Sequence, residues 1–92
     1  MHFAIVCFDK PNSDEIRKTN RPAHLEYLEK HRPQILVTGP MLGDDGETPI
    51  GSLLILDFKD RTAAKAFAAG DPYNKAGLFE SVTVKAWRKV FP

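Results

Sequence analysis

The apolar segments of this chain follow one another in the order strand, helix, strand, strand, helix, strand. β-branched and aromatic residues dominate the strand-like segments, whereas apolar residues recur at helical spacing in the other two. The six segments span residues 2–8, 20–31, 34–42, 50–58, 61–69 and 80–91. This order predicts an α+β protein with the split βαβ, ferredoxin-like arrangement βαββαβ, in which both helices cover one face of a four-stranded sheet.

Capping and turn residues predict where the helices begin and end. Asn12 is expected to cap a short helical turn, and Asn20 to cap the first main helix, with Pro22 in its first turn. Asp60 is expected to cap the second helix, which Gly70 ends. The first main helix is therefore expected to begin shortly before residue 21.

The amount of apolar sequence predicts a partner. The chain has 92 residues, which we interpret as a single domain spanning 1–92, and 42% of them are hydrophobic. The first and third strand segments are apolar on both faces, although helices are expected on only one side of the sheet. We therefore predict a homodimer that packs sheet face against sheet face.

Charge and motif content exclude several classes of function. The 13 Lys and Arg residues nearly balance the 12 Asp and Glu residues, which argues against nucleic-acid binding and against a polybasic membrane patch. The third strand carries no central aromatic residue for stacking RNA bases, and no glycine-rich phosphate loop is present. Cys7 is expected to be a buried, reduced side chain. With no recognisable leader or membrane-spanning segment, the expected location is the cytoplasm.

His24 and Asp71 are the candidate acid–base pair. His24 interrupts the apolar side of the first helix, and Asp71 directly follows Gly70 and precedes Pro72. A position near the helix N-terminus disfavours the imidazolium, whereas a neighbouring carboxylate favours it, and a proton-transfer residue needs such a balance. The alternatives are a histidine at the edge of the core that bonds a backbone carbonyl, and an aspartate that only caps a short turn.

The other candidate residues carry weaker signals. Arg21 is a candidate for a substrate carboxylate or a solvated charge, and Tyr73 for the pocket wall, whereas Tyr27 is expected in the core. Trp87 is expected in the core or an interface. His31 lies too far along the helix from His24 to share a metal, so no metal site is expected.

Four short motifs, taken together and in order, resemble the YCII-related (YciI-like) family. They are Phe3-Ala4-Ile5-Val6, Arg21-Pro22-Ala23-His24-Leu25-Glu26-Tyr27-Leu28, Thr38-Gly39-Pro40 and Gly70-Asp71-Pro72-Tyr73. The resemblance implies a dimeric α+β barrel with a ferredoxin-like protomer. It also implies a site of one histidine and one aspartate, which fall on His24 and Asp71, with Gly39 and Pro40 beside the same pocket. One characterised type in that family removes chloride from a chlorinated hydroxyquinol.

These observations lead to two hypotheses of different classes. The first is a small-molecule enzyme without metal or organic cofactor, in which His24 and Asp71 transfer a proton on a small cyclic or aromatic metabolite. A lyase or isomerase reaction is expected, with a hydrolase as a further option. Its substrate-binding residues would be Arg21, Thr38, Gly39, Pro40 and Tyr73. The second hypothesis is a non-catalytic dimer that binds a metabolite or assists a larger enzyme.

Overall fold

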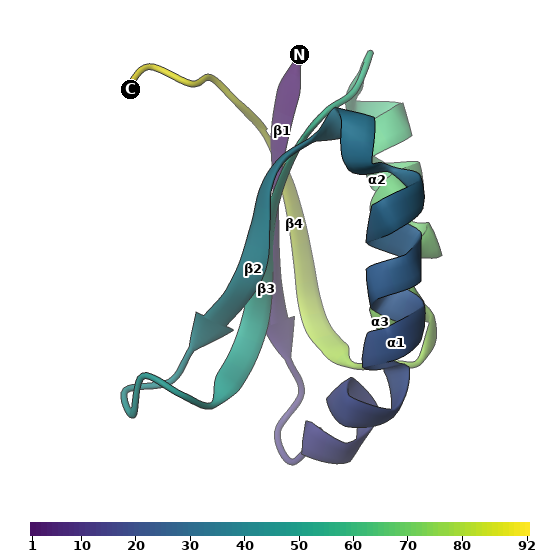
Figure 1. Ribbon diagram of the computed structural model, residues 1–92, viewed down its shortest axis with the longest axis vertical. Helices are drawn as coiled ribbons and strands as arrows, with labels where there is room; N and C mark the ends of the chain where they lie inside the picture. The colour runs from purple at the N-terminus through teal and green to yellow at the C-terminus, as the bar shows by residue number, and fades with distance from the viewer.

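The computed structural model describes residues 1–92 and contains the expected βαββαβ order, with the short turn expected after Asp71 and one further short helical segment. The elements are β1 (His2–Asp9), α1 (Asp14–Lys30), the 3-10 helix η1 (Arg32–Gln34), β2 (Ile35–Leu42), β3 (Pro49–Asp57), α2 (Arg61–Gly70), α3 (Pro72–Lys75) and β4 (Phe79–Trp87). The strands form one antiparallel sheet in the order β2-β3-β1-β4. All of the helices lie on one face of it (Figure 1). The predicted ferredoxin-like fold is confirmed.

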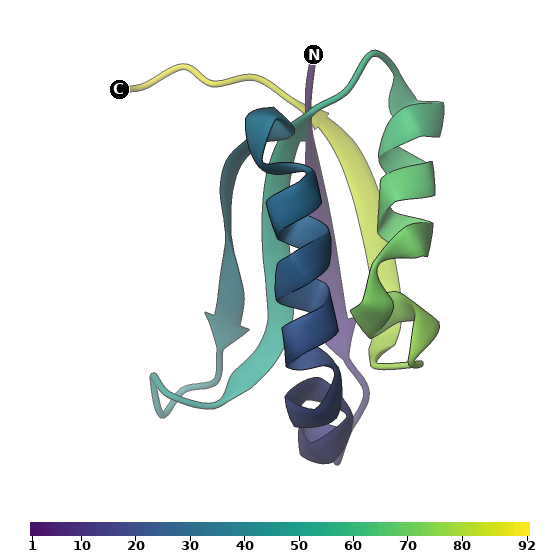
Figure 2. The same cartoon turned by 45° about the vertical axis from the view of Figure 1, so that its right-hand side comes forward.

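The hydrophobic core lies between the sheet and the helices. Along β1, Phe3, Ile5 and Cys7 are buried and alternate with more exposed neighbours, as expected for a strand with one covered face. Helices α1 and α2 lie side by side across that face (Figure 2). Together they enclose the core residues Phe3, Ile5, Cys7, Leu54, Leu56, Phe58, Ala64, Phe67, Ala68, Tyr73, Leu78 and Phe79.

The predicted start of the first helix is wrong. Helix α1 is continuous from Asp14, with Ser13 at its N-cap and Pro22 inside it. Asn20 does not cap a helix; its side-chain amide donates to the carbonyl of Ile16, 2.9 Å away. Proline removes one backbone donor, but α1 continues through it because the helix packs against the core on both sides of that position. Asn12, expected to cap a short turn, has a left-handed φ of 56° and precedes the helix.

The predicted second helix is confirmed, whereas the last strand is shorter than expected. Asp60 caps α2 by accepting a hydrogen bond from the backbone N–H of Ala63 at 2.9 Å. Strand β4 ends at Trp87, not at residue 91, and Trp87 pairs with His2, where β1 begins. Trp87 lies outside the core and packs edge-on against His2 at the end of the sheet. Beyond it the chain leads away from the sheet (Figure 1), and Phe91 is 90% exposed.

The face of the sheet opposite the helices is apolar at its centre. The pairing register places Ala4, Val6 and Phe8 of β1 on this face. Their neighbours include Leu53 of β3, while Val37 of the edge strand β2 is 52% exposed.

None of the helices has the length and the apolar character that a membrane-spanning helix needs.

Candidate active site

Folding brings His24 and Asp71 into direct contact. His24 extends from the middle of α1, and Asp71 stands at the junction of α2 and α3. His24 Nδ1 lies 2.9 Å from Asp71 Oδ1, across a sequence separation of 47 residues. The two residues are only 8% and 3% exposed. Because α1 begins about three turns before His24, its positive end is too distant to act on the ring, contrary to the sequence prediction.

Asp71 holds the histidine and caps a helix with the same oxygen. Its Oδ1 accepts a second hydrogen bond, 2.9 Å long, from the backbone N–H of Tyr73 in the first turn of α3. Asp71 therefore caps a short helix, which was the alternative raised from the sequence, and contacts His24 as well. A carboxylate can only accept, so Nδ1 carries the proton in the neutral ring, and Nε2 keeps the free lone pair.

Aromatic stacking fixes the plane of the imidazole. The His24 ring lies parallel to the Tyr73 ring, with centroids 4.0 Å apart and an interplanar angle of 13°. Nearby, the hydroxyl of Tyr27 donates to the carbonyl of Phe67 and thereby ties α1 to α2. Tyr27 is packed against the core, as predicted. A side chain at Gly70 would place its Cβ 2.6 Å from the Tyr27 hydroxyl, so a larger residue there would force the Tyr27 ring to shift.

Arg17 is a buried part of the site that the sequence reasoning missed. Its guanidinium makes a two-point contact with the Asp9 carboxylate, at 2.9 and 3.0 Å, and also donates to Ser52 Oγ at 3.1 Å. Its Cζ lies 4.8 Å from the centre of the Tyr73 ring. Arg17 precedes His24 by about two helical turns on the same side of α1. That spacing would have revealed it if the helix had been predicted to begin at Asp14.

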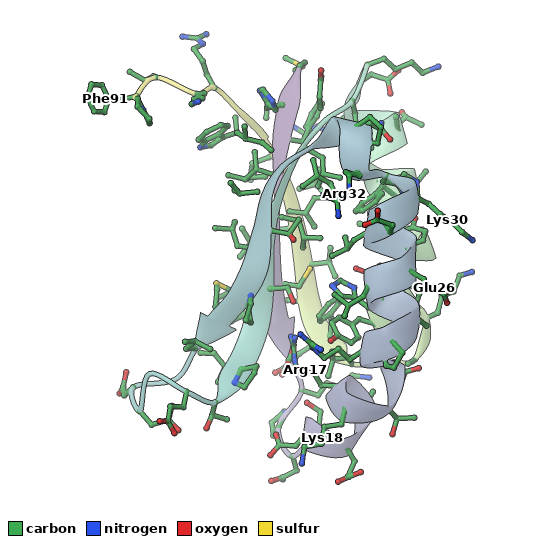
Figure 3. All side chains as sticks on the ribbon, viewed as in Figure 1. Arg17, Lys18, Glu26, Lys30, Arg32 and Phe91 are labelled. Atoms are coloured by element: carbon green, nitrogen blue, oxygen red, sulfur yellow. The ribbon has the colours of Figure 1, made fainter.

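A cavity of about 550 Å³ opens between α1 and the β2–β3 end of the sheet. Thr38 and Pro40 face it because they pair with Leu54 and Ser52, whose side chains point toward the helices. Its walls contain Asp14, Arg17, Lys18, Arg21, His24, Leu25, Leu28, Thr38, Gly39, Pro40, Glu47, Thr48, Pro49, Ser52, Leu54 and Tyr73. All of the residues predicted to bind substrate therefore line one cavity together with His24. In Figure 3, Arg17 points between α1 and the sheet, whereas Glu26 and Lys30 point away from it.

Burial and neighbouring charges set the protonation states around the cavity. Burial raises the pKa of Tyr73, although the Arg17 and Arg21 guanidiniums oppose this effect. Burial disfavours the charge of Arg17, but its hydrogen bonds and attraction to Asp9 outweigh this, so its pKa is raised. Burial, reinforced by the charges of Asp71 and Asp9, raises the pKa of Cys7 to about 12. Tyr73 and Cys7 therefore stay protonated and Arg17 stays charged at neutral pH.

His31 lies outside this site. Its ring contacts Tyr27 and Phe67, and its Nδ1 is 2.8 Å from the carbonyl oxygen of Tyr27. No group of three or more His, Cys, Asp or Glu side chains is arranged to hold a metal ion.

The fold and the cavity define a class of protein, a ferredoxin-like α+β protein with a cavity between its first helix and its sheet. The family model of the YCII-related domain matches residues 1–88. The chain is also 40% identical to Protein YciI of Escherichia coli over 98 aligned residues, which cover 99% of this chain and 100% of that protein. The chain belongs to the YCII-related family.

Solved structures extend this relationship. The 5-chloro-2-hydroxyhydroquinone dehydrochlorinase TftG of Burkholderia phenoliruptrix, in complex with 2,5-dihydroxybenzoquinone, is 37% identical, with a TM-score of 0.87 over 96% of this chain and 94% of that one. SnoaB, a cofactor-independent oxygenase of Streptomyces nogalater, is 11% identical, with a TM-score of 0.62 over 99% of this chain and 96% of that one. This second likeness shows the fold alone.

Proposed function

We propose that this protein is an enzyme that transfers a proton on a small cyclic or aromatic metabolite, with His24 as the base and Asp71 as its partner. The observation that carries the proposal is the 2.9 Å contact between a buried Asp71 oxygen and Nδ1 of His24, which lines the cavity, whereas Asp71 lies behind it. The volume of about 550 Å³ falls in the range typical of small-molecule sites.

The proposed reaction begins at His24 Nε2. With Nδ1–H held by Asp71, the lone pair on Nε2 accepts a proton from a carbon or hydroxyl of the substrate. The ring becomes an imidazolium, which the Asp71 carboxylate stabilises across their shared hydrogen bond. In an elimination, the electron pair left on the substrate forms a new double bond and expels the leaving group, such as chloride, and the imidazolium releases its proton to solvent. In an isomerisation, the imidazolium instead returns the proton to another substrate atom. His24 is thereby regenerated.

The relationship to the dehydrochlorinase supports this choice of reaction class. That protein acts on a ring bearing hydroxyl groups and chlorine, and its structure contains a quinone. At 37% identity over nearly the whole chain, it favours an elimination on an oxygenated ring over unrelated chemistries of the same fold.

Paired histidine variants test the proposal. We expect His24→Gln to lower chloride release from 5-chloro-2-hydroxyhydroquinone, or turnover of a better substrate found by screening hydroxylated aromatics, by about 10²- to 10⁴-fold. His31→Gln is the matched control, since His31 is on the same helix but outside the cavity, and it should retain activity. If His24→Gln turns over at the wild-type rate, His24 is not the base and the proposed mechanism fails. If the wild type turns over none of these compounds, the remaining hypothesis is a non-catalytic dimer that binds a metabolite.

We further propose that the protein is a homodimer that buries the open face of the sheet. The support is the apolar surface around Ala4, Val6, Leu53 and Val37, which no helix of the chain covers. We expect light scattering during size-exclusion chromatography to give twice the chain mass for the wild type. Val37→Asp should shift the protein toward monomer, whereas the exposed-tail control Val90→Asp should not. A monomeric wild type, or an unchanged Val37→Asp dimer, would refute this interface.

A further inference from the structure

The inner wall of the cavity contains an arginine whose N–H donors are not all bound by carbonyl or carboxylate oxygens of the chain. Arg17 Nε and Nη2 are occupied by Asp9, the carbonyl of Gly51 and the hydroxyl of Ser52, at 2.9 to 3.1 Å. Its other terminal nitrogen, Nη1, donates to no carbonyl or carboxylate of the chain, and the guanidinium hydrogen-bonds the Tyr73 hydroxyl. The side chain is only 12% exposed, and Arg17 lines the cavity. The guanidinium and the Tyr73 hydroxyl therefore form one group of donors at the cavity, from which a ligand there can accept hydrogen bonds.

Two hydroxyl groups of the cavity wall, those of Tyr73 and Ser52, carry a hydrogen that no acceptor of the chain binds. No carbonyl or carboxylate of the chain accepts from the Tyr73 hydroxyl, although the residue is only 2% exposed. The Tyr27 hydroxyl, by contrast, is fully engaged with the carbonyl of Phe67. Ser52 Oγ accepts from Arg17, but its own hydrogen has no acceptor in the chain. Both Tyr73 and Ser52 line the cavity.

The position of Tyr73 connects these donors to His24. Its ring is stacked on the imidazole at 4.0 Å and lies 4.8 Å from Arg17 Cζ. Arg17 and His24 are separated by about 10 Å along α1. The phenol ring therefore bridges the guanidinium and the imidazole, and its hydroxyl belongs to the same wall as both.

We propose that Arg17, Ser52 and Tyr73 form a binding site for a negatively charged substrate oxygen beside His24. This inference rests on the proposed function and adds a substrate requirement to it. When Nε2 takes a proton, the electron pair left on the substrate moves through a conjugated system to an oxygen. The hydroxyl hydrogens of Tyr73 and Ser52, which have no acceptor in the chain, then bind that oxygen as a phenolate or enolate, and the Arg17 guanidinium beside them stabilises its charge. The substrate is accordingly a phenol or an enolisable carbonyl compound.

Charged groups of both signs surround the cavity. Asp9 neutralises the net charge of Arg17, so that Arg17 acts mainly through directed N–H donors. Arg21 and Lys18, which also line the cavity, make no ion pair in the chain and supply positive charge nearer the opening. Asp14 and Glu47 oppose them from the same walls. We therefore expect the buried donors, and not the charges at the opening, to dominate the selection.

Binding of 4-nitrophenol tests this site without turnover, because ionisation to the yellow nitrophenolate is visible by absorbance. We expect the wild type to increase the nitrophenolate fraction at fixed pH and to bind nitrophenolate more tightly than neutral nitrobenzene. Tyr73→Phe keeps the stacked ring and removes one hydroxyl. It should weaken nitrophenolate binding about tenfold or more, since hydrogen bonds to charged groups are the stronger class, and leave nitrobenzene binding unchanged. Tyr27→Phe is the matched control and should bind both ligands like the wild type.

Arg17→Lys keeps a cation for Asp9 but loses the forked donors, so it should weaken nitrophenolate binding as well. If this variant does not fold, Tyr73→Phe decides the question. Unchanged nitrophenolate binding by Tyr73→Phe, or a wild-type preference for nitrobenzene, would overturn the inference. The proposed function fails separately, if His24→Gln keeps full turnover while the nitrophenolate results stand.

Discussion

Replacing Asp71 with asparagine and with alanine separates its two roles. Asparagine can still accept the hydrogen bond from the Tyr73 N–H, because its side-chain oxygen occupies the same place and Asn is a good N-cap. It cannot stabilise an imidazolium as a carboxylate does. Alanine removes both interactions and leaves the buried Nδ1–H of His24 without a partner.

The contacts determine the expected magnitudes. Loss of a charge-assisted hydrogen bond worth about 1.5–3 kcal/mol should lower kcat of Asp71→Asn by about 10- to 100-fold. Its stability should change by less than about 1 kcal/mol, since the cap remains. Asp71→Ala loses about 1 kcal/mol for the cap and about 1–3 kcal/mol for the unpaired ring nitrogen.

Asp60 provides the matched control, because it caps α2 at 2.9 Å but does not line the cavity. Asp60→Ala should lower Tm by about 4–8 °C, as expected for a loss of about 1 kcal/mol in a domain of this size. Asp71→Ala should lower Tm roughly two to four times as far, and Asp60→Asn should keep full activity. Thermal unfolding and steady-state kinetics on the four variants measure both effects. If Asp71→Asn retains kcat while Asp71→Ala matches Asp60→Ala in Tm, Asp71 is only a helix cap.

Three further predictions concern groups around the site. Gly70→Ala should lower the free energy of unfolding by about 1–3 kcal/mol, measured by thermal unfolding, because its Cβ collides with the Tyr27 hydroxyl. Adding Tyr27→Phe to this variant should restore part of the loss. If the losses of the two single variants simply add in the double variant, this explanation is wrong. Cys7, with its pKa raised to about 12, should react with a thiol reagent at pH 8 only after denaturation, so rapid labelling of the native protein would be evidence against its burial. Asp45 has its pKa lowered to about 2, first by the Thr48 hydroxyl. Its contribution to the β2–β3 loop is therefore present above pH 4 and lost as the pH falls toward 2, which amide NMR shifts of Thr48 should follow and Asp45→Asn should abolish.

The sequence was informative where a pattern is local. The β-branched and aromatic residues of segment 2–8 predict β1, which is apolar on both faces. Asp60 predicts the start of α2 because its side chain caps the helix directly. Asn20 misled the prediction of α1. Its preference for N-cap positions, next to Pro22, indicated a helix start. The packing of α1 against the core outweighs both local preferences, and the Asn20 amide instead bonds the preceding turn.

The prediction of the site also depended on where α1 begins. The His24–Asp71 contact spans 47 residues; only the fold could join them, although the resemblance to a family indicated both positions. Arg17 was missed because the predicted helix began after it, so its place on the His24 side of α1 was not apparent. Tyr73 was recognised as a pocket residue, but its stacking on the imidazole was not predicted. The stacking depends on how α3 is oriented, and the sequence predicted only that a short turn occurs there.

Because Asp71 Oδ1 serves both the fold and the site, substitutions at this position affect both. One oxygen receives a donor from the backbone of α3 and another from the ring of α1. Any replacement during natural drift would have to satisfy a main-chain amide and an imidazole at once, which glutamate is too long and serine too short to do. Inactive descendants of this lineage should therefore keep an aspartate or asparagine here long after the histidine has changed.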